Sequence, residues 1–101
     1  MKYQLRFEPK ALEEWNSLDK SIRIQFAKKL ESRLIEPDVP ASRLGGELKG
    51  FYKLKLASAG YRLVYKVFNS ELIVLVLSVG RRDKSGVYED AARREKKTPP
   101  H

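Results

Sequence analysis

Cationic side chains alternate with apolar ones along two neighbouring runs, 51–56 and 61–68, that have the pattern of β-strands. The cations are Lys53, Lys55, Arg62 and Lys66, and no acidic residue lies between positions 48 and 70. Because alternate residues of a strand point to opposite faces, Leu54 and Leu56 point away from the two lysines. If the aliphatic side chains pack on helices, the cations of both strands share the other face.

A third strand-like run is also followed by cationic residues. Residues 71–79 are almost all apolar, and Gly80, Arg81 and Arg82 follow directly. Glycine lets the chain bend, so we expect at least one of the two arginines to turn towards the cationic face.

Clustered cations favour an anionic partner. Two cations about 8 Å apart repel each other by roughly 2 kcal/mol at an effective dielectric constant near 20. That cost is removed when an anion occupies the space between them. The alternative is that the long side chains only extend into water from an exposed sheet face. Composition and spacing leave both possibilities open.

Lysine, arginine and tyrosine together suit phosphodiester chemistry on RNA, whose own 2′-hydroxyl can be the nucleophile. A lysine whose pKa is lowered by neighbouring cations can accept a proton near neutral pH. Arginine keeps its proton and therefore serves better as a phosphate clamp. A tyrosine ring can stack on a base.

Most other catalytic sets are excluded. The chain has no cysteine, and its single histidine, His101, follows two prolines at the end, so a zinc site is not expected. Gly45 and Gly50 have the spacing of a phosphate-binding loop, but Phe51-Tyr52 follows where Lys-Ser or Lys-Thr is required. Glu13-Glu14 and Glu89-Asp90 have the pattern of solvated helix faces. We therefore expect no metal and no cofactor.

Hydrophobic periodicity predicts the elements that position these residues. The fold class is α+β, with a four-stranded, mostly antiparallel sheet, an N-terminal helical hairpin on one face and a C-terminal helix. The expected strands are 3–7, 51–56, 61–68 and 71–79, and the expected helices are 9–17, 21–35 and 85–96. Residues 36–49 are expected to form a loop. Tyr52, Tyr61, Tyr65 and Trp15 are interpreted as packing residues.

The 101 residues fit one domain, which we place at 1–97, with a disordered tail at 98–101. The formal net charge is +8. Residues 1–50 have ten Lys/Arg against eight Asp/Glu, and residues 51–101 have eleven against five, so the second half carries +6 of that charge. This asymmetry favours a polyanionic partner such as nucleic acid. Without a signal peptide or a membrane-length apolar run, we expect a cytoplasmic protein and no membrane partner.

Several segments in this order resemble the RelE family of toxins, within the RelE/ParE superfamily of prokaryotic toxin–antitoxin modules. They are YKLKL, GYRLVYKV and LSVGRRDKSGVY, preceded by a two-helix layout. The similarity runs from Tyr3 to about Ala92. The resemblance implies a metal-independent endoribonuclease that cuts mRNA in the ribosomal A site by attack of the 2′-hydroxyl and so inhibits translation. It also implies mRNA, ribosomal RNA and a cognate antitoxin protein as partners.

The resemblance also implies roles for individual residues. Lys53 and Lys55 match the lysine pair that supplies the base and stabilises charge, and Arg62 matches a phosphate-clamping arginine. Arg82 matches the catalytic arginine near the leaving group, and Tyr88 the aromatic residue that orients or stacks on the substrate. Arg81, Lys66 and Lys84 are expected to contact RNA or the ribosome.

Each role has a structural alternative. The lysines can be ordinary exposed strand residues, Arg62 can be a cross-strand ion-pair partner, and Arg82 can pair with Asp83 or Glu89. Tyr88 can be buried between the last helix and the sheet. Two other functions stay open: a ParE-like protein that inhibits DNA gyrase by binding alone, and a simple nucleic-acid-binding module.

Overall fold

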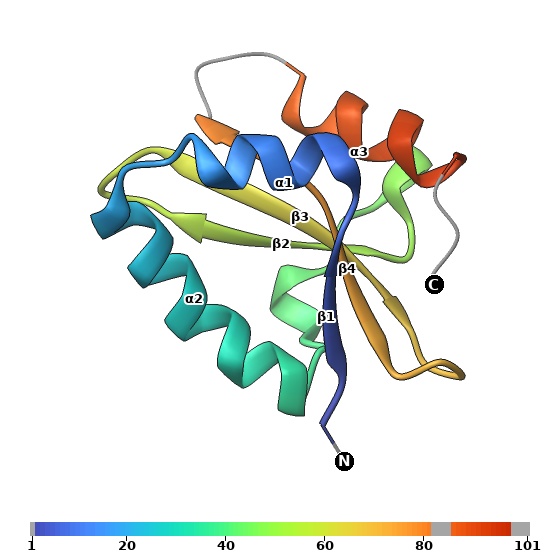
Figure 1. Ribbon diagram of the computed structural model, residues 1–101. Coiled ribbons are helices and arrows are strands. Elements are labelled where there is room, and N and C mark those ends of the chain that lie inside the picture. The colour runs from blue at the N-terminus through green and yellow to red at the C-terminus, as the bar shows by residue number, and fades with distance from the viewer. Residues whose placement is uncertain (1, 82–85, 98–101) are drawn as a thin grey trace.

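The fold was obtained as a computed structural model of the 101-residue chain, which describes residues 2–81 and 86–97 (Figure 1). In chain order the elements are β1 (Gln4–Phe7), α1 (Pro9–Asn16), α2 (Lys20–Ile35), the short 3-10 turns η1 (Pro40–Ser42) and η2 (Gly46–Leu48), β2 (Phe51–Leu56), β3 (Tyr61–Phe68), β4 (Ile73–Arg81) and α3 (Val87–Glu95). The predicted start of the last helix at Ser85 and the predicted disordered tail lie outside the described residues. One domain over 1–97 stays a prediction.

The four strands form one sheet in the order β1-β4-β3-β2. β4 pairs in parallel with β1 and antiparallel with β3, and β3 pairs antiparallel with β2. β4 is therefore an inner strand, and all its residues from Ile73 to Val79 are buried. The predicted α+β class and mostly antiparallel sheet are confirmed.

Helices cover both faces of the sheet, and each face has its own core. On one face, α1 and α2 contribute Ala11, Ile22, Phe26 and Leu30 to a cluster with Leu54, Leu63 and Val76. On the other face, α3 places Ala91 on a cluster that contains Phe51, Val64 and Leu77. In Figure 1, α2 and α3 accordingly lie on opposite sides of the sheet. The helical hairpin therefore covers one face of the sheet, and α3 covers the other.

A β-bulge interrupts the pairing of β3 with β4. Val64 pairs with Ser78 but the next residue, Tyr65, pairs with Val76, so Leu77 is an extra residue in β4. Leu77 packs in the core beneath α3, and the Ser78 hydroxyl donates a 2.6 Å hydrogen bond to the carbonyl oxygen of Val87 at the start of α3. Both residues thus face α3, and the bulge re-aims the last residues of the strand.

The turn before β4 is longer than predicted. The strand begins at Ile73 rather than at residue 71, because Leu72 adopts a left-handed conformation with φ of 56°. Its backbone N–H reaches back to the carbonyl oxygen of Asn69 over 3.4 Å. A left-handed residue cannot continue an extended strand, so the connection spans Asn69–Leu72 rather than two residues.

The predicted packing residues are part of the core beside the helical hairpin. Trp15 lies between Phe7 and Phe26, with ring centroids 5.3 and 6.4 Å away. Tyr52 and Tyr65 are buried and stack at 5.4 Å. Their interpretation as packing residues is confirmed. No helix within the described ranges has the length and hydropathy needed to cross a membrane.

The same two tyrosines hold the loop that follows α2. The Tyr65 hydroxyl donates to the carbonyl oxygen of Pro37 at 2.8 Å, and burial raises the pKa of Tyr65 to about 12. The Tyr52 hydroxyl donates to Asp38, which also accepts from Arg43 at 3.0 Å. These two hydrogen bonds, from Tyr52 first and then Arg43, hold the pKa of Asp38 below its usual range. The loop is thereby fixed against the sheet.

Candidate functional site

Strand register brings three of the predicted site residues onto one face. Lys55 of β2 pairs with Arg62 of β3, Arg62 pairs with Gly80 of β4, and Lys53 lies two residues before Lys55 on the same face. We call Lys53, Lys55 and Arg62 the cationic row. It shares its face with Val64 and Phe51, which pack beneath α3, while Leu54 and Leu56 pack on the hairpin side. The predicted separation of cations from aliphatic residues is confirmed.

The cationic row has no counter-charge in the part of the chain that the structure describes. Lys55 is exposed, and Lys53 and Arg62 are half-buried. None of the three side chains has a hydrogen-bond or ion-pair partner among residues 2–81 and 86–97. The cross-strand ion pair considered for Arg62 is therefore not formed with any described residue. Three uncompensated cations on adjacent strands make a surface suited to phosphate.

Gly80 lies next to Arg62 where α3 begins. A Cβ atom at Gly80 would lie 3.4 Å from Cγ2 of Val87, so the glycine allows the N-terminal end of α3 to approach the strand closely. This contact, together with the Ser78–Val87 hydrogen bond, places the start of α3 beside the end of β4. The cationic row and α3 are thus adjacent on the same face.

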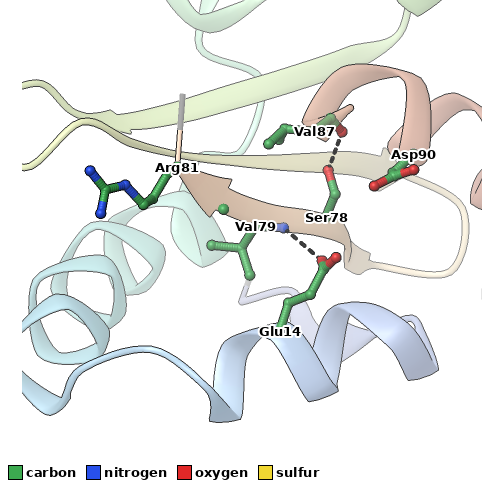
Figure 2. Close-up of a pocket in the computed structure, with 7 residues that line it drawn as sticks. Glu14, Ser78, Val79, Arg81, Val87 and Asp90 are labelled. Atoms are coloured by element: carbon green, nitrogen blue, oxygen red, sulfur yellow. Dashed lines mark hydrogen bonds between the residues drawn. The ribbon is translucent and has the colours of Figure 1, made fainter. Parts of the chain in front are cut away.

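Of the two arginines after Gly80, the structure describes only Arg81. Arg81 pairs with Tyr61, and it follows Val79 of the hairpin-side core by two residues, so it points to the face opposite the cationic row. In Figure 2 its guanidinium points away from Glu14, Ser78 and Asp90. Arg82 and Lys84 lie outside the described residues. The roles of all three residues stay predictions.

Tyr88 packs rather than standing free. Its half-buried ring lies against the core beneath α3, beside Leu48 of η2. It lines a cavity of about 240 Å³ with Gly45, Leu48, Glu89 and Ala92. No cation is among these lining residues within the described chain. The structural alternative for Tyr88 therefore describes this conformation, and its contact with substrate stays a prediction.

Lys66 lies on the same face of β3 as Arg62, but its side chain forms an ion pair with Glu95. Its ammonium lies 2.7 Å from Oε2 of Glu95 on α3 and over the rings of Phe51 and Phe68, 5.5 and 5.3 Å from their centroids. The side chain thus joins β3 to the last turn of α3. Its predicted contact with RNA or the ribosome stays a prediction, and the ion pair gives it a structural task as well.

Sequence reasoning missed a buried arginine that joins α1, β4 and α3. Arg94 is 7% exposed and makes a two-pronged contact with Glu14, with Nη1–Oε1 and Nη2–Oε2 distances of 2.9 Å. Nη1 also donates to the carbonyl oxygen of Leu77 at 2.9 Å. The hydrogen bond with Glu14 is the main reason that the pKa of Arg94 is raised. A signal existed: Val87, Ala91 and Arg94 share one helical stripe, and an arginine on an apolar stripe needs a buried partner.

Glu14 and Arg94 take the place of a neighbouring strand. β1 accompanies β4 only as far as Val76, where the Glu8 N–H donates to the Val76 carbonyl oxygen at 2.9 Å. Beyond that point, the Glu14 carboxylate accepts from the Val79 N–H at 3.2 Å, as Figure 2 shows, and Arg94 donates to the Leu77 carbonyl oxygen. The expectation that Glu13-Glu14 is a solvated helix face is wrong for Glu14, because this open strand edge needs polar partners.

A cavity of about 260 Å³ lies beside this pair. It is lined by Glu14, Ser78, Val79, Gly80, Arg81, Val87 and Asp90 (Figure 2). Asp90 lies 3.6 Å from Nη2 of Arg94, so both carboxylates of the cavity face the same guanidinium. Their charge is used within the protein, and this cavity is a less suitable place for phosphate than the cationic row.

This chain is similar in sequence and in fold to known toxins. Residues 5–86 match the family described as "ParE toxin of type II toxin-antitoxin system, parDE". The chain is 45% identical over 94 residues to "mRNA interferase toxin RelE" of Escherichia coli K12, covering 93% of this chain and 98% of the relative. A mutant of the E. coli toxin RelE in the free state superposes with a TM-score of 0.84 at 44% identity, covering 93% of this chain and 98% of that one.

The same E. coli toxin in complex with a peptide of its antitoxin RelB superposes with a TM-score of 0.77 at 44% identity, over 90% of this chain and 95% of that one. Identity and coverage of this extent, with a shared sheet and helical hairpin, establish kinship beyond the fold alone. The chain belongs to the RelE family of toxins, within the RelE/ParE superfamily.

Proposed function

We propose that this chain is the toxin of a type II toxin–antitoxin module and cleaves mRNA in the ribosomal A site, so that translation stops. The observation that carries the proposal is the cationic row: Lys53, Lys55 and Arg62 lie on adjacent strands without counter-charge among the described residues. Its relatives named mRNA interferase match over nearly the whole chain. RNA is the polyanion that this surface and these relatives indicate.

The reaction is an attack of the RNA 2′-hydroxyl on the adjacent phosphorus. A P–O bond forms to the 2′-oxygen and the bond to the 5′-oxygen breaks, which leaves a 2′,3′-cyclic phosphate and a 5′-hydroxyl. One proton must leave the 2′-hydroxyl, and one must reach the 5′-oxygen. We assign the lysine pair to the first transfer and to charge stabilisation, without choosing between Lys53 and Lys55.

Arginines hold the phosphate in this proposal. Arg62 donates to the non-bridging oxygens, whose charge grows in the transition state, and such a donor is typically worth about 3–4 kcal/mol. Arg82 is proposed to act near the leaving 5′-oxygen and Tyr88 to orient the substrate base. For Tyr88 this requires the ring to leave its packed position beside Leu48.

The partners follow from the same proposal. They are mRNA on the ribosome, ribosomal RNA and a cognate antitoxin, and the place of action is the cytoplasm. RelE of E. coli has been solved with antitoxin RelB. An antitoxin that covers the cationic row or displaces α3 would block the reaction.

The second candidate is inhibition of DNA gyrase by binding alone, which the ParE description of the matching family favours. The fold does not separate the two, because function depends on the site. The lysine pair with Arg62 favours the nuclease.

Mapping of mRNA 5′-ends tests the proposal. The purified chain is added to translating ribosomes and to free mRNA, with an Arg82→Ala variant alongside. We expect cuts in the A-site codon that require ribosomes and disappear in the variant. A folded wild-type chain that makes no cuts would overturn the nuclease and move gyrase inhibition to first place.

A further inference from the structure

A groove beside the cationic row carries a second group of cations. It has a volume of about 260 Å³ and is lined by Lys29, Arg33, Ala41, Ser42, Lys53, Leu54 and Lys55. Two of its cations come from α2 and two from the edge strand β2, and no acidic residue lines it within the described chain. Lys53 and Lys55 belong both to this groove and to the cationic row, so the two surfaces are continuous.

The wall of the groove is preorganised. The half-buried guanidinium of Arg33 donates from Nη2 to Oγ of Ser42 at 3.1 Å. Ser42 is itself buried, in the segment that Tyr52, Asp38 and Arg43 fix against the sheet. Arg33 is therefore held in place before any ligand arrives, which lowers the entropic cost of binding.

The remaining cations are available. The ammonium groups of Lys29, Lys53 and Lys55 have no ion-pair or hydrogen-bond partner in the part of the chain that the structure describes. The carboxylate of Asp38, in the loop that follows α2, is already engaged by Tyr52 and Arg43. Lys29 and Arg33 lie one helical turn apart on α2, and their like charges repel each other unless an anion enters.

The edge of β2 adds a backbone donor to the groove. Phe51 accepts a 3.0 Å hydrogen bond from the Leu44 N–H on the side of β2 that faces away from β3, where Tyr52 and Arg43 form an isolated antiparallel bridge. Because backbone groups of alternate residues point to the same side of a strand, the N–H group of Lys55, beyond this bridge, points to the same edge. Such a donor suits a phosphate oxygen.

We propose that this groove is an RNA-backbone subsite, in which Lys29 and Arg33 bind a phosphate that neighbours the cationic row in space. The inference rests on the proposed function, since it extends the path of the RNA from the reacting phosphate over the edge of β2. The phosphate can belong to the mRNA strand or to ribosomal RNA, and both present the same chemistry. Lys29 and Arg33 bind without taking part in the reaction.

Salt-dependent RNA binding tests the groove. The variant Lys29→Ala/Arg33→Gln removes two cations, and its matched control, Lys20→Ala/Lys28→Ala, removes two exposed cations of α2 that do not line the groove. The probe is single-stranded RNA with 2′-methoxy groups, which cannot be cut. Losing the contact with one phosphate lowers the slope of log affinity against log salt by about 0.7, so raising salt from about 50 to about 200 mM costs the variant about 2.6-fold less affinity than wild type.

The control is expected to keep the wild-type slope. Equal slopes for groove variant and control would overturn the subsite, and so would a groove variant that loses antitoxin affinity but no RNA affinity. Circular dichroism checks that both variants are folded, and Arg33→Gln keeps an amide donor for Ser42.

Cleavage on ribosomes separates the two sources of phosphate. Two mRNAs are compared: one continues beyond the cleavage position, and the other ends at it. If the groove variant raises KM only for the longer mRNA, the bound phosphate belongs to the mRNA. A raised KM for both identifies ribosomal RNA, and kcat stays unchanged in either case. An altered kcat with unchanged KM would contradict a binding role. If the wild-type chain cuts nothing but the slope difference persists, the proposed function falls and the groove stands.

Discussion

Two groups of charged residues in this small domain are arranged in opposite ways. Around the end of β4, Arg94 is buried and is surrounded by Glu14, Asp90 and Glu8 at 2.9, 3.6 and 3.8 Å. On β2 and β3, the cationic row has no counter-charge among the described residues. The first group connects α1, β4 and α3, whereas the side chains of the second group connect no described elements with one another.

The difference shows how the same side-chain type acquires a structural or a functional task. A buried guanidinium with several polar partners is held by groups that the fold itself supplies, and its removal leaves those groups uncompensated. A cation without a partner raises the energy of the protein alone and lowers it when an anion binds. We therefore expect substitutions at Arg94 to act on stability and substitutions in the cationic row to act on activity.

The largest effect is expected for Arg62→Ala. Loss of the phosphate clamp should slow mRNA cleavage about 10²- to 10³-fold. The free energy of unfolding should change by less than about 0.5 kcal/mol, since the side chain has no described partner. Single-turnover cleavage on ribosomes and urea unfolding measure the two quantities. A large loss of stability would place Arg62 with the structural group instead.

Arg94→Ala should act in the reverse way. It leaves the Glu14 carboxylate and the Leu77 carbonyl oxygen without their guanidinium, and the free energy of unfolding should fall by about 3 kcal/mol. The matched control is Arg93→Ala, whose side chain is 57% exposed and should change stability by less than about 0.5 kcal/mol. Urea unfolding measures the free energy of unfolding of both variants. If both lose the same amount of stability, Arg94 has no special structural role.

Lys66 combines features of both groups, because it lies on the face of the cationic row but forms an ion pair with Glu95. Its ion pair with Glu95 is about a quarter exposed on both sides, so a double-mutant cycle with Lys66→Met and Glu95→Gln should give a coupling of about 0.5–1 kcal/mol. A coupling near zero, with slower cleavage in Lys66→Met alone, would move Lys66 to the cationic row.

The smallest effect concerns pH. Asp38 has a lowered pKa in the folded protein because of its bonds from Tyr52 and Arg43. The stability it contributes is present above the pKa of the unfolded chain and is lost as pH falls through the folded value. The difference in unfolding free energy between wild type and Asp38→Asn should be constant at neutral pH and shrink from about pH 5 downwards. A difference that does not change with pH would exclude this ionisation.

The sequence predicted those features that depend on local periodicity. Alternation on β2 and β3 was sufficient to place Lys53, Lys55 and Arg62 on one face, and the apolar run of β4 indicated an inner strand. Contacts between distant segments were not predictable in the same way. The pairing of Glu14 with Arg94, 80 positions apart, depends on the bulge at Leu77 and on where β1 ends. The left-handed Leu72 and the packed ring of Tyr88 likewise depend on tertiary context.

The most direct measurement compares two double variants of equal charge on ribosomes. Lys53→Ala/Lys55→Ala removes the lysines of the cationic row, and Lys20→Ala/Lys28→Ala removes two exposed lysines of α2. At saturating toxin, we expect the control to cleave mRNA at the wild-type rate and the first variant to be at least about 10²-fold slower, with both equally stable. If the two variants cleave at the same rate, the cationic row is not the catalytic surface.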